Sequence, residues 1–266
     1  MVIGTYRMPS FEVMESVVRC CFENNIAAFD TAPSYGTESM LGKAIQENCN
    51  GHNFFCSDKI DAIQMYEGKI NEHVEGRLQM MSLDSFDLLL IHWPLPQYLE
   101  RTWQQMQELK DEGKIKKIGI CNVRVRHLEK FAKENIVPDY IQIERHPLNT
   151  CDEELAYCKD NHIKVMAYSP LGQMLPKIKT SSVLNELAKK YSKNVGQIIL
   201  RWHVQEGFST IPGARNPDYI KENIEVYNFK LSEDDMKKIR GLDKEKRFFT
   251  TTLAEIQHFK DWNPGD

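Results

Sequence analysis

Eight short runs of apolar residues recur along this chain of 266 residues, and stretches with helical spacing separate them. The runs cover residues 2–5, 27–30, 54–57, 87–92, 117–121, 140–144, 164–168 and 209–212. They are continuous rather than alternating, as expected for parallel strands that are buried on both faces. Regular strand–helix alternation predicts a parallel sheet. Eight repeats within this length predict a closed (βα)8 barrel, a fold that typically needs about 250 residues.

Helical patterns fill most of the intervals between these strands. Ser10 is a suitable N-cap for a helix that starts at residue 11, and further helices are predicted at 37–48, 68–81, 102–112, 125–134, 152–161 and 194–206. Gly113 and Gly207 suit helix C-caps, and Ser232 is placed to begin a last helix. No linker interrupts the pattern, which predicts one domain over 1–266 with a C-terminal tail, residues 243–266, near the barrel mouth.

The composition argues against several classes of partner. The chain has 34 basic and 38 acidic residues and an isoelectric point near 6.1, so nothing favours nucleic acid or an anionic membrane surface. No run approaches the roughly 18 apolar residues of a membrane span. The seven cysteines lack the spacing of a disulfide framework, and no secretion signal is visible. A reduced cytoplasmic protein, monomeric or weakly homo-oligomeric, is the simplest interpretation.

Four polar side chains lie at or just beyond the ends of three predicted strands: Asp30, Tyr35, Lys59 and His92. Active sites of (βα)8 barrels are built at the C-terminal ends of the strands, so these residues are expected to converge on one mouth. Taken singly, each is more often a structural cap or ion-pair residue. Together they indicate an enzyme that protonates an oxygen.

The chemistry follows from the pKa of a tyrosine, which is near 10 and too high for an efficient acid at neutral pH. A lysine ammonium about 4 Å away contributes about 4 kcal/mol at an effective dielectric constant of 20. That energy corresponds to a pKa lowered by up to about 3 units. Tyr35 is thus predicted to be the general acid, and Lys59 the residue that lowers the pKa of Tyr35. Asp30 is predicted to be the counter-ion of Lys59, and His92 the residue that orients the substrate.

Other chemistries are weaker alternatives. Lys59 as a Schiff-base amine is disfavoured because Asp30 would keep it protonated. Cys49, His52 and Cys56 have loose metal-ligand spacing without an evident fourth ligand, so no metal site is predicted.

An ordered series of motifs along nearly the whole chain resembles the aldo-keto reductase family. The motifs are Asp30-Thr31-Ala32 with Tyr35-Gly36, His92-Trp93-Pro94, Ile118-Gly119-Ile120-Cys121-Asn122, Gln142-Ile143-Glu144, Ala167-Tyr168-Ser169-Pro170-Leu171-Gly172 and Ile211-Pro212-Gly213-Ala214-Arg215. The resemblance implies a (βα)8 carbonyl reductase that uses NADP(H), with direct hydride transfer to an aldehyde, ketone or sugar and a tyrosine as acid. His92 also favours carbonyl reduction, since members that reduce carbon–carbon double bonds carry an acid there.

The resemblance also implies a set of cofactor contacts. Asn122 and Gln142 would hold the carboxamide, Tyr168 would stack on the nicotinamide, and Ser169 and Leu171 would meet the pyrophosphate. The remaining implied cofactor contacts are Thr5, Asp30, Cys121, Gly213, Arg215, Asn216, Glu222 and Asn223. Tyr6, His92 and Trp93 are expected to line the substrate pocket. The chain contains no G-x-G-x-x-G motif, so a Rossmann site is not available.

Two departures from the family pattern bear on the cofactor. Cys121 stands where serine is usual, and a thiol is a weaker hydrogen-bond donor. Gly213 and Tyr219 replace the basic residues that many members place near the 2′-phosphate, which leaves Arg215 as the nearest cation and NAD(H) as the alternative to NADP(H). A catalytically weak, cofactor-binding sensor or regulatory subunit is the competing function.

Overall fold

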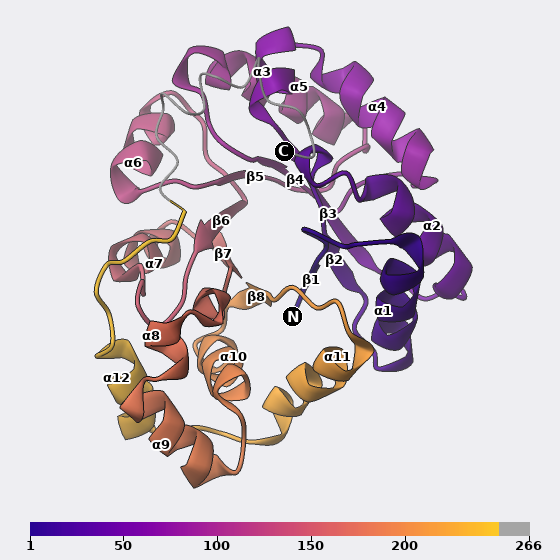
Figure 1. The fold of residues 1–266 in the computed structure, drawn as a ribbon. Coiled ribbons are helices and arrows are strands. Elements are labelled where there is room, and N and C mark those ends of the chain that lie inside the picture. Colours follow the sequence, from indigo (N-terminus) through magenta and orange to yellow (C-terminus); the bar gives the residue numbers. More distant parts are fainter. Residues whose placement is uncertain (250–266) are drawn as a thin grey trace.

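The structure is a computed structural model that describes residues 1–249. Its eight strands are hydrogen-bonded in chain order, and every neighbouring pair is parallel. The strands are β1 Ile3–Gly4, β2 Ala28–Asp30, β3 Phe55–Ile60, β4 Leu88–Ile91, β5 Ile118–Cys121, β6 Tyr140–Glu144, β7 Lys164–Tyr168 and β8 Ser209–Ile211. Figure 1 shows them at the centre of the molecule with the helices around them.

Backbone contacts between the first and last strands close the barrel. Val2 N donates to Thr210 O at 2.8 Å, and Gly4 N donates to Pro212 O at 3.2 Å. Gly4 also forms a parallel bridge with Gly213. The predicted (βα)8 barrel is therefore confirmed, and the C-terminal ends of all its strands lie at the same end of the barrel.

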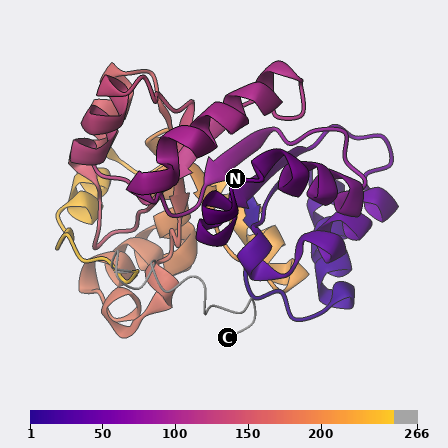
Figure 2. The ribbon, with the colours of Figure 1, turned by 90° about the horizontal axis from the view of Figure 1, so that it is seen from above.

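Twelve α-helices lie in the described part of the chain, mostly on the outside of the barrel (Figure 2). They are α1 Phe11–Glu23, α2 Glu38–Asn48, α3 Ala62–Glu67, α4 Ile70–Met81, α5 Pro96–Asp111, α6 Val125–Lys133, α7 Asp152–Asp160, α8 Pro176–Lys179, α9 Ser182–Tyr191, α10 Val195–Gln205, α11 Pro217–Ile224 and α12 Glu233–Arg240. Within this part of the chain, no helix is both long and apolar enough to cross a membrane.

Apolar side chains pack on both faces of the barrel wall. A small cluster fills the inside of the barrel and includes Leu88, Leu90 and Met166. The largest cluster lies between strands and helices and includes Leu89 and Ile91 from the same strand. This burial on both faces explains why the strands read as continuous apolar runs in the sequence.

Several element boundaries differ from the sequence predictions. Strand β3 does not end at residue 57 but continues through Lys59 to Ile60, because β4 keeps pairing with it. Helix α5 begins at Pro96 rather than residue 102, so the connection after His92 is shorter than expected. Helices α3, α8, α9 and α11 were not predicted; α3 and α8 are only six and four residues long.

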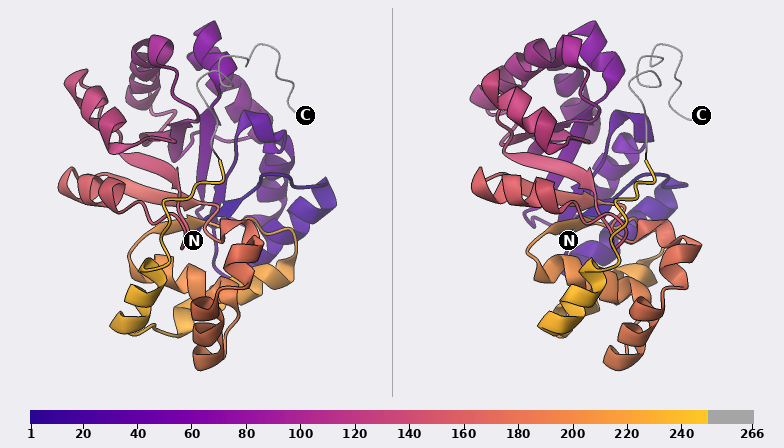
Figure 3. Two further views of the ribbon diagram at one scale, coloured as in Figure 1. Left: turned by 60° about the vertical axis from the view of Figure 1, so that its left-hand side comes forward. Right: turned by 90° about the vertical axis from the view of Figure 1, so that its left-hand side faces the viewer.

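The described part of the tail, residues 243–249, leaves α12 and passes α7 toward the ends of the strands (Figures 1 and 3). The backbone N of Lys246 donates to Leu148 O at 2.8 Å. Both oxygens of the Glu144 carboxylate accept from the tail, from Phe248 N at 2.7 Å and Phe249 N at 3.1 Å. This part of the tail therefore lies at the barrel mouth, as predicted; residues 250–266, with Trp262, lie outside the described residues.

Candidate active site

Asp30 and Lys59 form a buried ion pair at the mouth of the barrel. Asp30 is the last residue of β2, Lys59 lies near the end of β3, and Lys59 Nζ is 2.6 Å from Asp30 Oδ2. The Asp30 carboxylate also accepts from Ser57 Oγ at 2.7 Å and Gln142 Nε2 at 2.9 Å. Burial alone would lower the pKa of Lys59, but the charge of Asp30 outweighs it and raises that pKa. Lys59 is therefore a fixed ammonium.

Tyr35 lies beside this ammonium. It ends a short 3-10 helix, Pro33–Tyr35, and its ring centroid is 4.9 Å from Lys59 Nζ. Burial of the hydroxyl raises the pKa of Tyr35, while Lys59 lowers it and Asp30 raises it further. The net direction is upward, so the expectation that Lys59 brings this pKa below its ordinary value is wrong for this structure. The sequence argument omitted desolvation, which here exceeds the effect of the ammonium.

His92 follows β4 and faces the same site. Its ring centroid is 5.8 Å from that of Tyr35, in an edge-to-face arrangement. Its Nδ1 lies 2.5 Å from Asp61 Oδ1, and Asp61 Oδ2 accepts from Ser34 N at 2.8 Å. Burial would raise the pKa of Asp61, but His92 and Ser34 outweigh it and hold that pKa below its usual value. An ionised carboxylate only accepts, so Nδ1 of His92 carries a hydrogen.

The residues that the family resemblance implies to hold a nicotinamide lie next to the catalytic candidates. Asn122, in the left-handed region with φ 59°, donates from Nδ2 to His92 O at 2.9 Å. Its Oδ1 accepts from Tyr168 Oη at 2.7 Å, and Gln142 is bonded to Asp30. Cys121 is buried beside Lys59, and burial raises the pKa of its thiol. The structure therefore brings Asn122, Gln142, Tyr168 and Cys121 together with the catalytic candidates.

The residues implied to hold the rest of a dinucleotide lie further around the rim. Ser169 and Leu171 follow β7, and Gly213 follows β8. Arg215 is exposed, and Asn216 caps α11 by accepting from Asp218 N at 2.9 Å. Within residues 1–249, none of these residues forms a side-chain hydrogen bond with Tyr35 or Lys59.

Three further members of the implied cofactor set are engaged in local contacts. Thr5 is buried, and its hydroxyl is bonded to Thr31 at 3.0 Å and Thr37 at 2.9 Å. Glu222 accepts from Asn194 at 3.1 Å, and Asn223 is buried on α11. The hydrogen bonds of Thr5 and Glu222 indicate local structural roles in addition to any contact with a cofactor.

Two aromatic residues border the catalytic candidates. The Tyr6 ring is 5.0 Å from the Tyr35 ring and 49% exposed. Trp93 stacks on His92 at 6.2 Å. Both side chains therefore border the group formed by Tyr35 and His92.

The sequence analysis missed residues that support the site. Asp61 orients His92, Thr31 O accepts from Lys59 Nζ at 2.8 Å, and Ser57 bonds to Asp30. Asp61 lies two residues after Lys59. The clustering of polar residues at this strand end was the sequence signal that could have identified Asp61 as part of the site. Glu144, which anchors the tail, follows Gln142 on the same strand with the same spacing.

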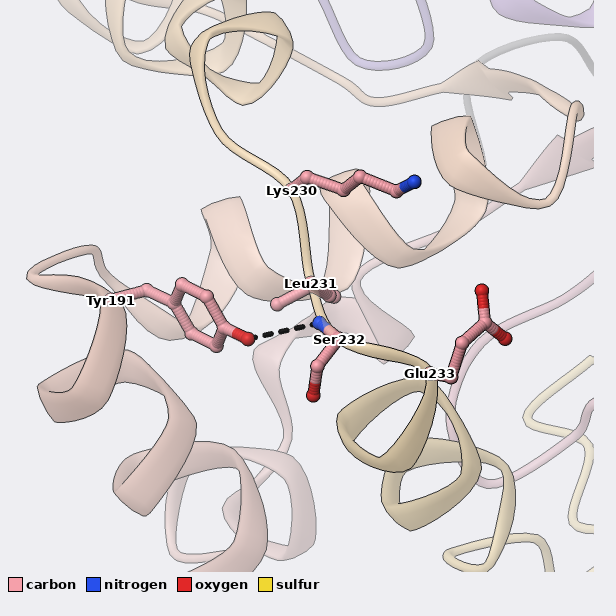
Figure 4. Close-up of a pocket in the computed structure, with 5 residues that line it drawn as sticks. All are labelled: Tyr191, Lys230, Leu231, Ser232 and Glu233. Atoms are coloured by element: carbon pink, nitrogen blue, oxygen red, sulfur yellow. Dashed lines mark hydrogen bonds between the residues drawn. The ribbon is translucent and has the colours of Figure 1, made fainter.

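The metal-ligand candidates and one surface hollow are the other candidate features. Within residues 1–249, no group of three or more His, Cys, Asp or Glu side chains is placed to hold a metal ion, so Cys49, His52 and Cys56 do not make one. A surface hollow lies between α9 and α12 and is lined by Tyr191, Lys230, Leu231, Ser232 and Glu233 (Figure 4). There the Tyr191 hydroxyl accepts from Ser232 N at 3.0 Å and donates to Asp235 at 2.6 Å. These bonds fix the start of α12.

Comparison with known proteins gives a consistent result. Residues 1–244 match the model of the aldo/keto reductase family. The chain is 36% identical over 250 residues to a glyoxal reductase of Bacillus subtilis (strain 168), covering 92% of this chain and 89% of that protein. It is 34% identical over 250 residues to the methylglyoxal reductase DkgA of Escherichia coli O157:H7, covering 92% and 90%.

A solved structure shares the fold. The aldo-keto reductase MGS-M4, from a Medee basin deep-sea metagenome library, superposes with a TM-score of 0.88 at 31% identity, covering 94% of this chain and 93% of that one. The sequence motifs, the closed barrel and the position of the polar cluster agree with these matches. This chain belongs to the aldo/keto reductase family of oxidoreductases.

Proposed function

We propose that this protein reduces a small aldehyde or ketone to an alcohol with NADP(H), and that Tyr35 donates the proton. The observation that carries the proposal is the convergence of Asp30, Lys59, Tyr35 and His92 at one barrel mouth, with a buried ammonium 4.9 Å from the Tyr35 ring. The related glyoxal and methylglyoxal reductases point to small 2-oxoaldehydes as the substrate class.

Each side chain has a distinct part in this reaction. Lys59 stabilises the phenolate that Tyr35 becomes after it gives up its proton, and Asp30 keeps Lys59 charged inside the protein. His92 can donate from Nε2 to the carbonyl oxygen when both ring nitrogens carry hydrogen, since Nδ1 is bonded to Asp61. A bound reduced nicotinamide supplies the hydride for the carbonyl carbon.

The residues around the rim fit such a cofactor. Asn122 and Gln142 present amide groups to a carboxamide, and the Tyr168 ring stands at the end of β7. Arg215 is exposed directly before α11, and within residues 1–249 it forms no ion pair, so it is free to meet a phosphate near a helix N-terminus. This cation favours NADP(H) over NAD(H).

The substitution Tyr35→Phe tests the proposal. We expect turnover of methylglyoxal with NADPH to fall about 100- to 10,000-fold, because general acid catalysis is lost. NADPH binding, followed by fluorescence, should be unchanged, and NADH should serve less well than NADPH in the wild-type protein. Tyr227→Phe is a matched control, because Tyr227 contacts the N-terminal amine of Met1 beside the start of β2, at the opposite end of the barrel.

Undiminished turnover in Tyr35→Phe would contradict the assignment of the acid. A wild-type protein that binds NADPH but turns over none of a panel of aldehydes, ketones and sugars would instead support a cofactor-binding sensor on the same fold.

A further inference from the structure

Strand β3 turns its side chains alternately to the two faces of the barrel wall. Phe55 packs with the cluster inside the barrel, whereas Cys56 and Ile60 belong to the layer between strands and helices. Lys59 shares the inner face with Phe55, so Asp58 faces the helix layer. A carboxylate in that otherwise apolar layer requires an explanation.

Asp58 meets two other charged residues in this layer. Arg77 of α4 places Nε 3.4 Å from Asp58 Oδ2 and 3.9 Å from Oε1 of Glu38, the first residue of α2. The three residues are 7% exposed or less. Buried ion pairs add little net stability, because removing charges from water costs about as much as their attraction returns. Stability alone therefore does not account for this cluster.

The shortest hydrogen bonds of the cluster go to the backbone of Lys59. Arg77 Nη1 donates to Lys59 O at 2.7 Å, and Asp58 Oδ1 accepts from Lys59 N at 2.7 Å. By contrast, the ion-pair distances within the cluster exceed 3.3 Å. Both backbone polar groups of the lysine are thus fixed by charged side chains, which make the stronger class of hydrogen bond.

The end of β2 leaves these backbone groups without strand partners. Pairing of β2 with β3 stops at Asp30 and Ser57, with one last bond from Thr31 N to Ser57 O at 3.0 Å. Backbone groups two residues apart on a strand point to the same side, so those of Lys59 point past the end of β2. Buried backbone groups must find partners, and Asp58 and Arg77 provide them.

We propose that Asp58 and Arg77 are positioning residues for the reaction, because they hold the Lys59 backbone where its ammonium reaches both Asp30 and Tyr35. The inference rests on the proposed function of Lys59. Neither residue contacts the substrate side of the barrel wall.

The charge state of the cluster agrees with this role. Burial and the charge of Asp58 raise the pKa of Glu38 to about 8, although Arg77 opposes them. Burial also raises the pKa of Asp58, although Arg77 and the hydrogen bond from Lys59 N oppose it. On the other face, Asp30, Tyr35 and Cys121 surround the Lys59 ammonium.

The substitution Arg77→Met tests the inference, since it removes the donor to Lys59 O and keeps an unbranched apolar side chain. We expect kcat to fall about 10- to 100-fold, as for a catalytic group displaced by about 1 Å. The dissociation constant for NADPH should not change. The KM for methylglyoxal should also stay unchanged, because Arg77 acts on the position of Lys59 and not on substrate binding. Arg77→Lys should recover part of kcat.

Two further variants separate position from stability. Asp58→Asn with Arg77→Met removes both charges, leaves no unpaired guanidinium, and should show the same loss of kcat with an unchanged KM. Leu187→Ala, in the separate apolar cluster of α9, α10 and α12, should lower stability without lowering kcat.

The outcomes are distinct. If the folded Arg77 variants keep wild-type kcat and lose only thermal stability, the inference is wrong. It is also wrong if no variant of the cluster folds, since the cluster would then act on stability alone. Undiminished turnover in Tyr35→Phe overturns the proposed function instead. Loss of turnover in Tyr35→Phe together with unchanged Arg77 variants overturns this inference only.

Discussion

At the scale of the residue, Asp30 is the centre of the site. Its carboxylate accepts hydrogen bonds from Lys59, Ser57 and Gln142, which come from β3 and β6. This full set of donors offsets the cost of burying the charge. The fully buried Lys59 ammonium depends on that carboxylate as its counter-ion.

Replacing Asp30 by asparagine should therefore reduce both stability and turnover. The buried ammonium would lose its counter-ion, and removing one partner of a buried ion pair costs about 3–5 kcal/mol. Urea unfolding measures this loss, and steady-state assays measure the loss of turnover. Asp139→Asn is the control, because Asp139 also accepts from two lysines, at 2.9 and 3.0 Å, but is 24% exposed. The control should cost less than about 1 kcal/mol; equal losses would contradict the role of Asp30.

The four catalytic candidates could be predicted from the sequence because parallel strands place their ends together. Their supporting residues could not be. Asp61 acts through His92 and Arg77 through the backbone of Lys59, and such contacts depend on side-chain directions that spacing does not reveal. The upward shift in the pKa of Tyr35 could not be predicted from the sequence either, because desolvation is a property of the folded site.

At the scale of the element, the barrel wall depends on close approach between strands β4, β5 and β6. Gly119 lies in β5 between Leu90 of β4 and Tyr140 of β6. A Cβ atom at Gly119 would lie 2.3 Å from Tyr140 O and 2.7 Å from Leu90 Cδ2. Since one contact is backbone within a sheet, the neighbours cannot simply rotate away.

Gly119→Ala should therefore destabilise the protein by about 1–3 kcal/mol or more, as overpacking does. Gly76→Ala is the matched control, because Gly76 is an exposed residue of helix α4 with open space around it. There alanine should stabilise the protein by about 0.5–1 kcal/mol through its helix propensity. Thermal or urea unfolding of the two variants should thus give opposite signs; a neutral Gly119→Ala would contradict the close packing described here.

Boundaries of elements were predicted best where apolar burial decides them. Strands β6 and β7 match the predicted ranges, whereas β3 was cut short because Asp58 and Lys59 do not look like buried strand residues. Helices α8 and α11 were not predicted, since each is short and its first residue is a proline, which is also typical of loops.

At the scale of the whole molecule, closure of the barrel joins distant parts of the sequence into one site. Asp30 and Gln142, 112 residues apart, are in direct contact, and the tail reaches Glu144 at the same mouth. Eight repeats predicted this closure. The tail was also predicted to lie near this mouth. The hydrogen bonds that hold it there are tertiary, and no periodic pattern in the sequence encodes them.

The central claim is direct hydride transfer to a carbonyl carbon at this mouth. The most direct measurement follows deuterium from NADPH labelled at the transferred position of C4, during turnover of methylglyoxal, by NMR of the isolated alcohol. The account predicts one deuterium on the carbinol carbon for each NADPH consumed, in the wild-type protein and in the residual turnover of Tyr35→Phe. An unlabelled alcohol, with the deuterium released to water, would contradict it.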